Sequence, residues 1–237
     1  MLSAIEMKKR PLLERPRAIR IKFTKTGSQR YISHLDLQRT FTRAIIRSGI
    51  PVWYTKGFNP HSKLVFSSPL PIGCESICDY VDIKIDREAS FEEIKSALSA
   101  QFTDEMLILD VYEPETKFQD IVYINYKAEI TTKKASAELA SEIAAALKNS
   151  PFTVTKKSKS GDKDVDLVSF LPKVNAKHDG KKLVLEFTVG DGFGNTLSPE
   201  IIMRAIFSRF ELIEDEMHDY YSLLRTEILS RNMRPFR

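Results

Sequence analysis

Length, composition and charge exclude several classes of protein before any motif is considered. The chain has 237 residues, 42% of them apolar, and a formal net charge of +4, so one or two folded domains with a real core are expected. No apolar run is long enough to cross a membrane, residues 1–17 lack the apolar region of a secretory signal, and two cysteines cannot build a disulfide framework. We therefore expect a cytoplasmic protein without a membrane partner.

The first half of the chain predicts a strand, a helix, two strands, a helix and a strand. Alternating or continuous apolar runs predict the strands, at residues 18–23, 64–67, 80–85 and 106–112. Ser33 begins one helix, which Gly49 ends, and Ser90 begins the other. This βαββαβ order is that of a ferredoxin-like domain.

The second half predicts a similar order of elements, without visible sequence identity to the first. Strands are expected at 122–131, 152–156, 182–189 and 223–229, a short element at 165–171, and helices at 136–147 and after Ser198, where Pro199 occupies the first helical position. We predict an α+β fold of two tandem ferredoxin-like domains. The predicted boundaries are a tail at 1–17, a domain at 18–114, a linker at 115–120 and a domain at 121–237.

The charge distribution is uneven along the first half. Between Lys8 and Lys63 basic residues are frequent, and only Glu14 and Asp36 are acidic. Between Glu75 and Glu115 acidic residues dominate instead. If the cations gather on one exposed side, they would attract a polyanion; the alternative is a solvated surface whose opposite charges meet in the fold.

The polar segment around Ser33, His34 and Asp36 has a structural and a functional interpretation. Ser33 and Asp36 fit a capping box, and a helix N-terminus can also bind an anion. His34, Asp36 and His61 are candidates for acid–base catalysis or, less plausibly, for a metal site, if the fold brings them together. A helix of 12 residues is about 18 Å long, so a meeting of His34 with His61 is not assured.

The segment Lys56-Gly57-Phe58-Asn59-Pro60 predicts a turn that exposes Phe58 beside cations. Aromatic residues interleaved with cations suit single-stranded nucleic acid, although Trp53, Tyr54 and Phe58 could equally be anchors of a core. Arg39, Arg43 and Arg47 recur every four residues and form one helical stripe. That stripe is either a solvated face or a row of phosphate contacts.

Three further patterns are weak. Cys74 and Cys78 lack the spacing and the second pair that a metal or cluster site needs. The glycine-rich turn at 190–195 does not match a phosphate-binding loop. No nucleophile elbow supports Ser-His-Asp catalysis. We expect no metal and no cofactor.

Several short segments share a recognisable pattern: Arg30-Tyr31-x-Ser33-His34-Leu35-Asp36-Leu37, then Arg39 and Arg43, then Gly57-Phe58-Asn59-Pro60-His61, then Pro69-Leu70-Pro71-x-Gly73. Together they resemble the radical-SAM-linked protein family, whose members are uncharacterised bacterial proteins found beside or fused to a radical SAM protein. The later Val165-Asp166-Leu167 and Arg225-Thr226-Glu227 also look like family features, whereas Leu197-Ser198-Pro199 departs from an expected Arg-Pro. The resemblance implies a radical SAM partner. This chain has no C-x-x-x-C-x-x-C motif, so we do not expect it to hold the iron–sulfur cluster itself.

The resulting hypothesis is an RNA-binding accessory module that works with a radical SAM enzyme in tRNA or rRNA modification. The alternatives are an RNA-processing or RNA-modifying enzyme that uses His34 and His61 as general acid and base, and a protein-docking adaptor for a radical SAM protein. The sequence does not decide whether there is catalysis, although the balance is against it. The candidate RNA-binding residues are Lys22, Arg30, Arg39, Arg43, Arg47, Tyr54, Lys56, Phe58, Asn59, Lys63, Lys157 and Lys159.

Overall fold

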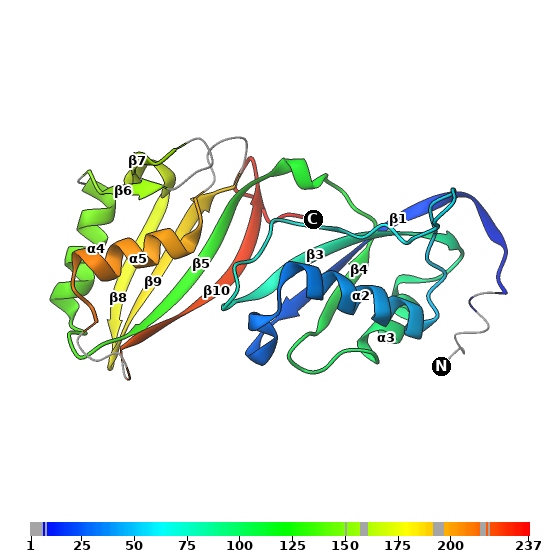
Figure 1. Ribbon diagram of the computed structural model, residues 1–237, viewed down its shortest axis with the longest axis horizontal. Helices are drawn as coiled ribbons and strands as arrows, with labels where there is room; N and C mark the ends of the chain where they lie inside the picture. Colours follow the sequence, from blue (N-terminus) through cyan, green and yellow to red (C-terminus); the bar gives the residue numbers. More distant parts are fainter. Residues whose placement is uncertain are drawn as a thin grey trace. The chain divides into compact units, whose positions relative to one another are not determined.

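The chain folds into two units, and each combines antiparallel strands with α-helices. The structure, a computed structural model, describes residues 7, 9–149, 151–156, 161–191, 197–213, 217 and 219–237. The first unit extends to Phe118 and includes Arg237, and the second comprises Gln119–Phe236 (Figure 1). The predicted α+β class is confirmed, and the boundary falls inside the segment predicted as a linker.

Unit 1 has the predicted order of elements. They are β1 (Leu12–Lys25), the 3₁₀ helix η1 (Gly27–Tyr31), α2 (His34–Ser48), β2 (Val65–Phe66), β3 (Cys74–Arg87), α3 (Phe91–Ser99) and β4 (Ile108–Tyr112). The strand order is β4-β1-β3-β2, and every neighbouring pair is antiparallel. Helices α2 and α3 supply the apolar side chains that cover one face of these strands.

Strand β1 is longer than the sequence predicts. It begins at Leu12 instead of residue 18, so residues 12–17 do not belong to a tail. Its register with β3 shifts between Leu12 and Arg17, and Pro16 in this interval has no N–H to donate. The proline interrupts the regular alternation, which explains why the pattern at the start of the strand was not visible.

The core of unit 1 follows the alternation of β1. Ile19, Ile21 and Phe23 are fully buried and face α2, because successive side chains of a strand point to opposite faces. The ring of Phe23 lies 4.7 Å from that of Phe41 on α2, centroid to centroid. Leu37, Phe41, Ala44 and Ile45 form the buried face of α2.

Helix α2 begins and ends at the predicted signals. Ser33 is its N-cap, and the Ser33 hydroxyl oxygen accepts a hydrogen bond of 3.1 Å from the Asp36 backbone N–H. Gly49 ends the helix with a φ of 71°, a left-handed conformation that glycine adopts without steric cost. The predicted capping box is half formed, because the Asp36 carboxylate accepts from the Ser33 hydroxyl, at 2.7 Å, instead of from the Ser33 backbone N–H.

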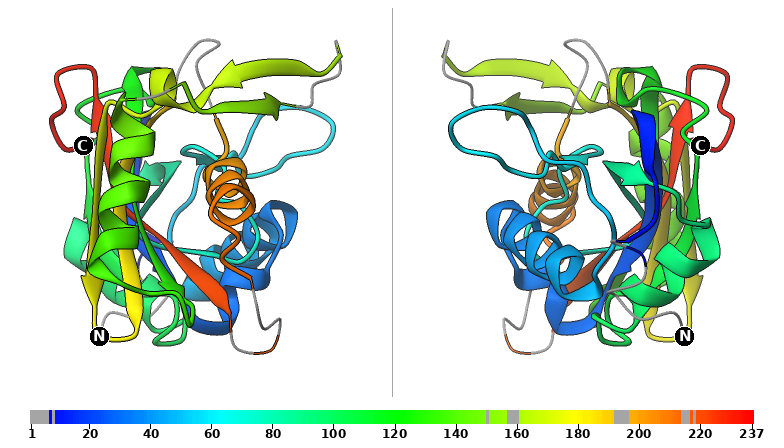
Figure 2. Two further views of the ribbon diagram at one scale, coloured as in Figure 1. Left: turned by 90° about the vertical axis from the view of Figure 1, so that its left-hand side faces the viewer. Right: turned by 90° about the vertical axis from the view of Figure 1, so that its right-hand side faces the viewer.

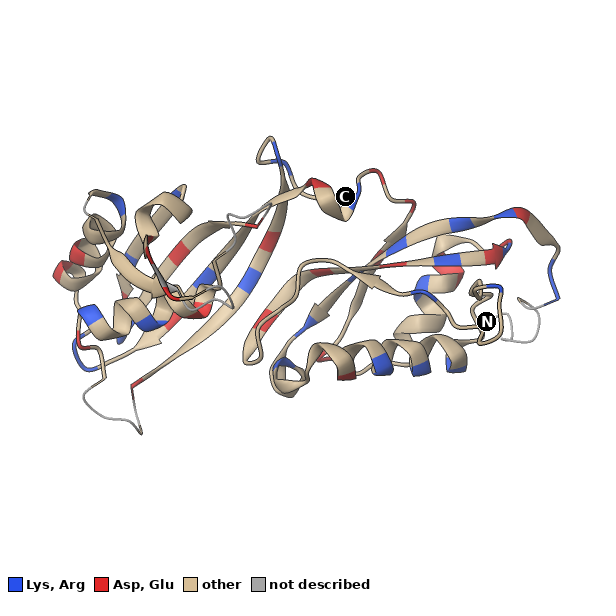
Figure 3. Cartoon of the chain, turned by 45° about the horizontal axis from the view of Figure 1, so that its top comes forward, with Lys and Arg blue, Asp and Glu red and all other residues tan. Residues whose placement is uncertain are grey.

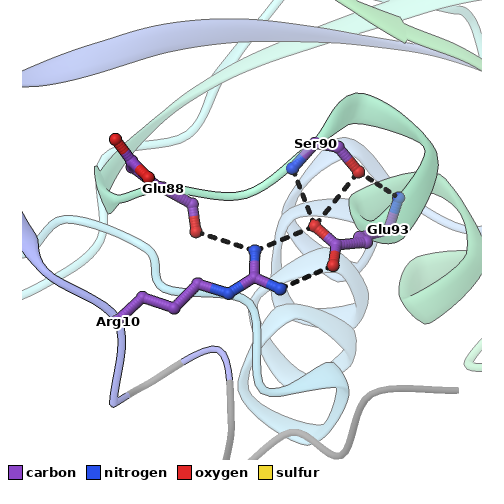
Figure 4. Close-up of polar contacts among 4 residues, drawn as sticks. All are labelled: Arg10, Glu88, Ser90 and Glu93. Atoms are coloured by element: carbon purple, nitrogen blue, oxygen red, sulfur yellow. Dashed lines mark hydrogen bonds and ion pairs between the residues drawn. The ribbon is translucent and has the colours of Figure 1, made fainter.

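Helix α3 has a complete capping box, which a distant arginine reinforces (Figure 4). The Ser90 and Glu93 side chains each accept a hydrogen bond from the other residue's backbone N–H. Arg10 donates to both carboxylate oxygens of Glu93, at 2.6 and 2.9 Å, and to the Glu88 carbonyl at 3.1 Å. These contacts lower the pKa of Glu93 to about 2, mainly through the hydrogen bond from Arg10.

The other face of the unit 1 strands carries a buried ion pair. Arg20 is fully buried and donates to both oxygens of Asp82, at 2.7 and 2.8 Å. It also donates to the Thr116 carbonyl at 3.0 Å, and its guanidinium lies 4.4 Å from the centroid of the Phe118 ring. The buried guanidinium of Arg20 thus holds the segment after β4 against the sheet.

The outer strand of unit 1 is interrupted by an excursion of the chain. Val52 pairs with Ile85 of β3, and pairing resumes at Val65 with Asp82. The Trp53 N–H still donates to the Lys84 carbonyl of β3, so residues 54–64 leave the sheet edge and return to it. The excursion, which contains the predicted turn at Gly57, is closed by the Tyr54–Ser62 bridge and by a hydrogen bond of 3.0 Å from the Thr55 N–H to the His61 carbonyl.

Unit 2 repeats the arrangement with an insertion. Its elements are η2 (Phe118–Asp120, which begins at the last residue of unit 1), β5 (Ile121–Thr131), α4 (Ala137–Asn149), β6 (Thr153–Lys156), β7 (Lys163–Asp166), η3 (Leu167–Phe170), β8 (Lys173–Asp179), β9 (Lys182–Gly190), α5 (Pro199–Arg209) and β10 (Tyr220–Ser230). The strand order β10-β5-β9-β8 is again antiparallel. Strands β6 and β7 form a hairpin of their own, drawn in yellow-green (Figure 2).

Two predictions for unit 2 need correction. The outer strand is β8, which the sequence analysis missed, and residues 153–156 belong to the separate hairpin instead. β8 is polar and mostly exposed, as edge strands commonly are, so it has no apolar alternation to predict it.

Helix α5 starts at Pro199 as predicted, but the Ser198 side chain makes no capping hydrogen bond to the described residues. Most of the glycine-rich turn at 190–195 lies outside the described residues.

Candidate nucleic-acid interface

The arginine stripe of α2 is exposed along its length. Arg39, Arg43 and Arg47 lie on the outer side of the helix, opposite the buried residues Phe41 and Ile45. Figure 3 shows these cations recurring along α2. Arg39 forms an ion pair of 3.2 Å with Asp36, and Arg47 Nε lies 3.3 Å from the side-chain oxygen of Gln101. The stripe therefore keeps most of its donors available to solvent.

The N-terminal end of α2 is organised for helix capping. Asp36 is exposed, and the hydrogen bond from the Ser33 hydroxyl, supported by Arg39, lowers the pKa of its carboxyl. A lowered pKa keeps this group ionised and disfavours a role as general acid near neutral pH. The exposed His34 packs edge-on against Phe66 of β2, with ring centroids 5.4 Å apart.

A buried lysine that the sequence analysis did not select fixes the segment before α2. Lys25, at the end of β1, is only 2% exposed. Its Nζ donates to the carbonyl oxygens of Ile32 at 3.2 Å and Arg30 at 3.4 Å. The Arg30 guanidinium lies over the Tyr31 ring at 4.9 Å and within 3.8 Å of Glu75. A lysine in place of an apolar residue at the inward-facing end of a strand is the signal that could have predicted this contact.

The tip of the excursion exposes an aromatic ring. Phe58 is fully exposed, and Lys56, Asn59 and His61 around it are also exposed. His61 belongs to the closing contacts of the loop, because its Nδ1 lies 3.2 Å from the Thr55 hydroxyl oxygen and 3.1 Å from the Asn59 carbonyl oxygen. These contacts close the base of the loop, and Phe58 and Lys56 are exposed at its tip.

A hollow connects the start of the excursion to α2. It has a volume of about 260 Å³ and lies where α2 ends and Val52 joins β3. Its walls come from the helix, the helix–strand connection and the end of β3: Ile45, Ile46, Ile50, Pro51, Val52, Tyr54, Asp86 and Arg87. Ile46 is 57% exposed and Tyr54 is 43% exposed. Ile46 adjoins Arg47 in sequence and lies one helical turn from Arg43, so the hollow borders the arginine stripe.

The structure brings some predicted residues together and separates others. Tyr54 shares the hollow with Ile46 beside Arg43 and Arg47, whereas His34 and His61 make contacts with different partners. No hydrogen bond or ring contact within the described part of the chain joins these two histidines.

Lys22 lies away from the arginine stripe. Its side chain is on the face of β1 opposite α2, where its Nζ is 5.9 Å from the centroid of the Tyr80 ring. The expectation that all the cations share one exposed side therefore does not hold. Lys63 is exposed, and Lys157 and Lys159 lie outside the described residues.

The described residues contain no group of three or more His, Cys, Asp or Glu side chains that could hold a metal ion. Cys74 and Cys78 are buried and are not joined in a disulfide. None of the helices in the described ranges has the length and apolarity needed to cross a membrane.

Unit 2 has a second hollow that the sequence analysis missed. It has a volume of about 470 Å³ and lies on the side of β5, β8 and β9 that carries polar residues, among them Asn125, Lys127, Asn175 and Thr188. The Thr188 hydroxyl donates to the Asn125 side-chain oxygen at 2.7 Å, and Lys127 pairs with Glu129 at 2.7 Å. Asn125 and Thr188 thus satisfy each other, and Lys127 is paired with a carboxylate beside the hollow.

The fold and the site define an α+β chain whose first unit carries a basic helix beside an exposed aromatic loop. The chain belongs to a bacterial family described as "Uncharacterized protein conserved in bacteria (DUF2344)", which matches residues 18–199. No curated protein matches it.

Two solved structures illustrate the structural similarity. A chain in the crystal structure of a Cbf5-Nop10-Gar1 complex is 8% identical with a TM-score of 0.48, and the match covers 89% of this chain and 48% of that one. This chain thus spans about half the length of that chain. An unknown protein from Galdieria sulphuraria is 11% identical with a TM-score of 0.25, covering 89% of this chain and 99% of that chain. With TM-scores below 0.5, neither similarity supports a functional inference.

Proposed function

We propose that this protein is an RNA-binding accessory module that works in the cytoplasm with a radical SAM enzyme, in the modification of tRNA or rRNA. We also propose that its two units are tandem ferredoxin-like domains. The equivalent strand orders β4-β1-β3-β2 and β10-β5-β9-β8 support the second proposal, with the β6–β7 hairpin as an insertion.

The observation that carries the RNA proposal is the position of Tyr54 beside the arginine stripe. Tyr54 and Ile46 line one hollow, and Arg43 and Arg47 flank Ile46 on α2. Guanidinium groups recognise phosphates through paired hydrogen bonds, and exposed aromatic rings stack on unpaired bases. Phosphate and base contacts are thus available on neighbouring parts of unit 1, with Phe58 and Lys56 at the loop tip as additional contacts.

The radical SAM partner rests on the resemblance of the first hundred residues to the radical-SAM-linked family. The first segment of this resemblance, from Arg30 to Leu37, spans the end of η1 and the start of α2. Lys25 donates to two carbonyl oxygens just before the helix, those of Arg30 and Ile32. The partner and the RNA are separate parts of the proposal and require separate experiments.

Fluorescence anisotropy with labelled tRNA and with rRNA fragments, measured over a salt series, tests RNA binding. The logarithm of the affinity should fall linearly with the logarithm of the salt concentration. Changing Arg39, Arg43 and Arg47 together to alanine should weaken binding and lower the slope by about two to three, since each lost phosphate contact contributes about 0.7–0.9. Arg204→Ala, which removes an exposed cation from α5 of unit 2, is the matched control. Absence of affinity at low salt would refute the proposal.

Co-purification with a radical SAM protein encoded by the same bacterium tests the partner. Co-purification combined with indifference to RNA would favour the adaptor alternative over RNA binding.

The catalytic alternative has less support, because His34 and His61 contact different partners. RNA altered by the wild type but not by His34→Ala or His61→Ala would reverse that preference.

A further inference from the structure

The hollow of unit 2 lies on the polar face of its sheet, opposite the buried rings of Tyr126 and Phe187, which stack at 5.7 Å. Successive side chains of a strand point to opposite faces, and Val174 of β8 pairs with Phe187, so the neighbours of these residues share the polar face. They are Asn125, Lys127, Lys173, Asn175, Glu186 and Thr188. The volume of about 470 Å³ is within the roughly 300–1,000 Å³ of ligand sites.

Part of this lining is available to a ligand. The side chains of Lys173, Asn175 and Glu186 make no hydrogen bond or ion pair with the described residues, and all three are exposed. Glu186 lies directly across from Lys127 in the register of β5 and β9. Lys127 nevertheless pairs with Glu129, at 2.7 Å. The hollow therefore combines a carboxylate, an amide and an ammonium group whose binding capacity the fold leaves unused.

Strand β8 presents these groups in the order cation, amide, cation. Lys173, Asn175 and Lys177 are exposed at alternate positions, so they share one face at intervals of about 7 Å. Lys177 likewise makes no contact of this kind with the described residues. Glu186 pairs with Asn175 in the register of β8 and β9, which places a carboxylate beside the amide, between the two lysines. A nucleic-acid strand has the matching order of phosphate, sugar and phosphate.

The carboxylate suits the sugar of RNA in particular. Lysine binds a phosphate as a point charge, whereas a carboxylate only accepts hydrogen bonds. The ribose 2′-hydroxyl can donate one, and this group is what distinguishes RNA from DNA. Deoxyribose has no donor at that position, so DNA would leave the carboxylate close to phosphates without a hydrogen bond to offset the repulsion.

We propose that the polar face of β8 and β9 binds a ribose–phosphate segment of an RNA strand and selects ribose over deoxyribose through Glu186. Lys173 and Lys177 bind successive phosphates, and the 2′-hydroxyl between them donates to Glu186, with Asn175 as a second polar contact. The inference rests on the proposed RNA-binding function and deepens it by giving unit 2 a site and a preference for RNA over DNA.

An RNA and a DNA oligonucleotide of the same sequence provide the test. A length of about 12 nucleotides lies within the range that single-strand binding sites cover. If the sequence contains only adenine and cytosine, the two strands differ in the 2′-hydroxyl and not in the thymine methyl group. By fluorescence anisotropy at constant salt, the wild-type protein should bind RNA about tenfold more tightly than DNA, the lower end for a hydrogen bond to a charged group.

Substitution of Glu186 isolates the carboxylate. Glu186→Ala should weaken RNA binding and leave DNA binding equal or tighter, because the repulsion of phosphates is also removed, so the preference for RNA is lost. Glu186→Gln retains an acceptor oxygen and should lose less of the preference. Glu142→Ala removes a carboxylate from an exposed position on α4 and should leave the ratio of affinities unchanged.

Substitution of the lysines tests the phosphate contacts. Changing Lys173 and Lys177 together to alanine should weaken RNA and DNA alike and lower the salt slope by about 1.4, at about 0.7 for each contact with a single strand. Lys148→Ala, at an exposed position on α4, is the control. Adenosine 5′-monophosphate at the concentration of the RNA should not compete, because it can engage only one of the two lysines. Equal competition would assign the site to a free nucleotide and overturn the inference.

The outcomes separate this inference from the function on which it rests. If RNA binds with a clear salt dependence, but the RNA-to-DNA ratio is the same in the wild type and in Glu186→Ala, the inference is wrong and the RNA-binding proposal stands. If no RNA binds at low salt, both fail. The ratio is measured on one protein sample, and unfolding would weaken both ligands, so a variant that is partly unfolded does not imitate the predicted change.

Discussion

The two units differ most at the same point of their topology, between the first helix and the outer strand. In unit 1 the chain passes from α2 to β2 through the excursion at residues 54–64, and the outer strand is reduced to Val52, Trp53 and β2. In unit 2 the β6–β7 hairpin and η3 occupy this interval, and the outer strand β8 is continuous over seven residues. The comparison teaches that this connection tolerates insertions while the pairing of the inner strands is kept.

The two insertions also differ in what they expose. The excursion of unit 1 presents Phe58 fully exposed and Tyr54 half-exposed, whereas the hairpin strands of unit 2, Thr153–Lys156 and Lys163–Asp166, contain no aromatic residue. Connections on the surface commonly carry function because the scaffold holds their ends. The aromatic insertion is therefore the better candidate for base recognition.

The largest expected effect concerns the buried charge of unit 1. Asp82→Ala leaves the fully buried Arg20 without its carboxylate. We expect a loss of roughly 3 kcal/mol in the free energy of unfolding, at the lower end of the range for a broken buried pair, because the Asp82 side chain is 24% exposed. Hydrogen exchange should accelerate in β1 and β4 and remain slow in β8 and β9. Equal acceleration in both units would show that they do not unfold separately, and Asp104→Ala is the exposed control.

The next effect tests the excursion itself. Replacing residues 56–60 by Asn-Gly keeps Thr55 and His61, which close the loop, and supplies a preferred two-residue turn. RNA affinity should fall about tenfold, as expected for a lost stacking contact, while the free energy of unfolding should change by less than about 1 kcal/mol. Lys181→Ala, at the β8–β9 turn of unit 2, controls for the lost cation. Unchanged RNA affinity in the shortened protein would assign no binding role to the excursion.

A smaller effect compares the equivalent helices α3 and α5. Ser90 caps α3 through a complete box, whereas the Ser198 side chain makes no capping bond with the described residues. Ser90→Ala should cost about 1 kcal/mol, and Ser198→Ala should cost less than about 0.5 kcal/mol. Urea denaturation monitored by circular dichroism measures both. Equal losses would show that Ser198 stabilises α5 in some other way.

The smallest effect is a pH dependence in unit 1. The folded-state pKa of Glu93 is about 2 and its ordinary value is 4.5, chiefly because Arg10 donates to the carboxylate. A lowered pKa means that the carboxylate stabilises the fold above about pH 4.5, and that this contribution is lost as the pH falls toward 2. The stability of the wild type should therefore fall more steeply between pH 5 and 2 than that of Arg10→Ala. Parallel curves would mean that the Arg10 contact does not persist in solution.

The local signals in the sequence were reliable where they concern backbone conformation. Ser33, Gly49, Ser90 and Pro199 mark helix boundaries that the structure reproduces, because capping bonds and glycine or proline dihedral preferences involve residues close in sequence. Strand β8 was missed because pairing with β9 creates it. A polar edge strand has little periodicity of its own.

The candidate site shows the same division. Sequence alone determined that Arg39, Arg43 and Arg47 share one helical face and that Phe58 lies in a turn, since both follow from spacing and turn chemistry. Tertiary structure decided that Lys22 lies on the opposite face of β1, that His34 and His61 have separate partners, and that Asp86 lines a hollow with Tyr54. The physical reason is that strand pairing joins residues distant in the chain, and no local pattern encodes which of them will meet.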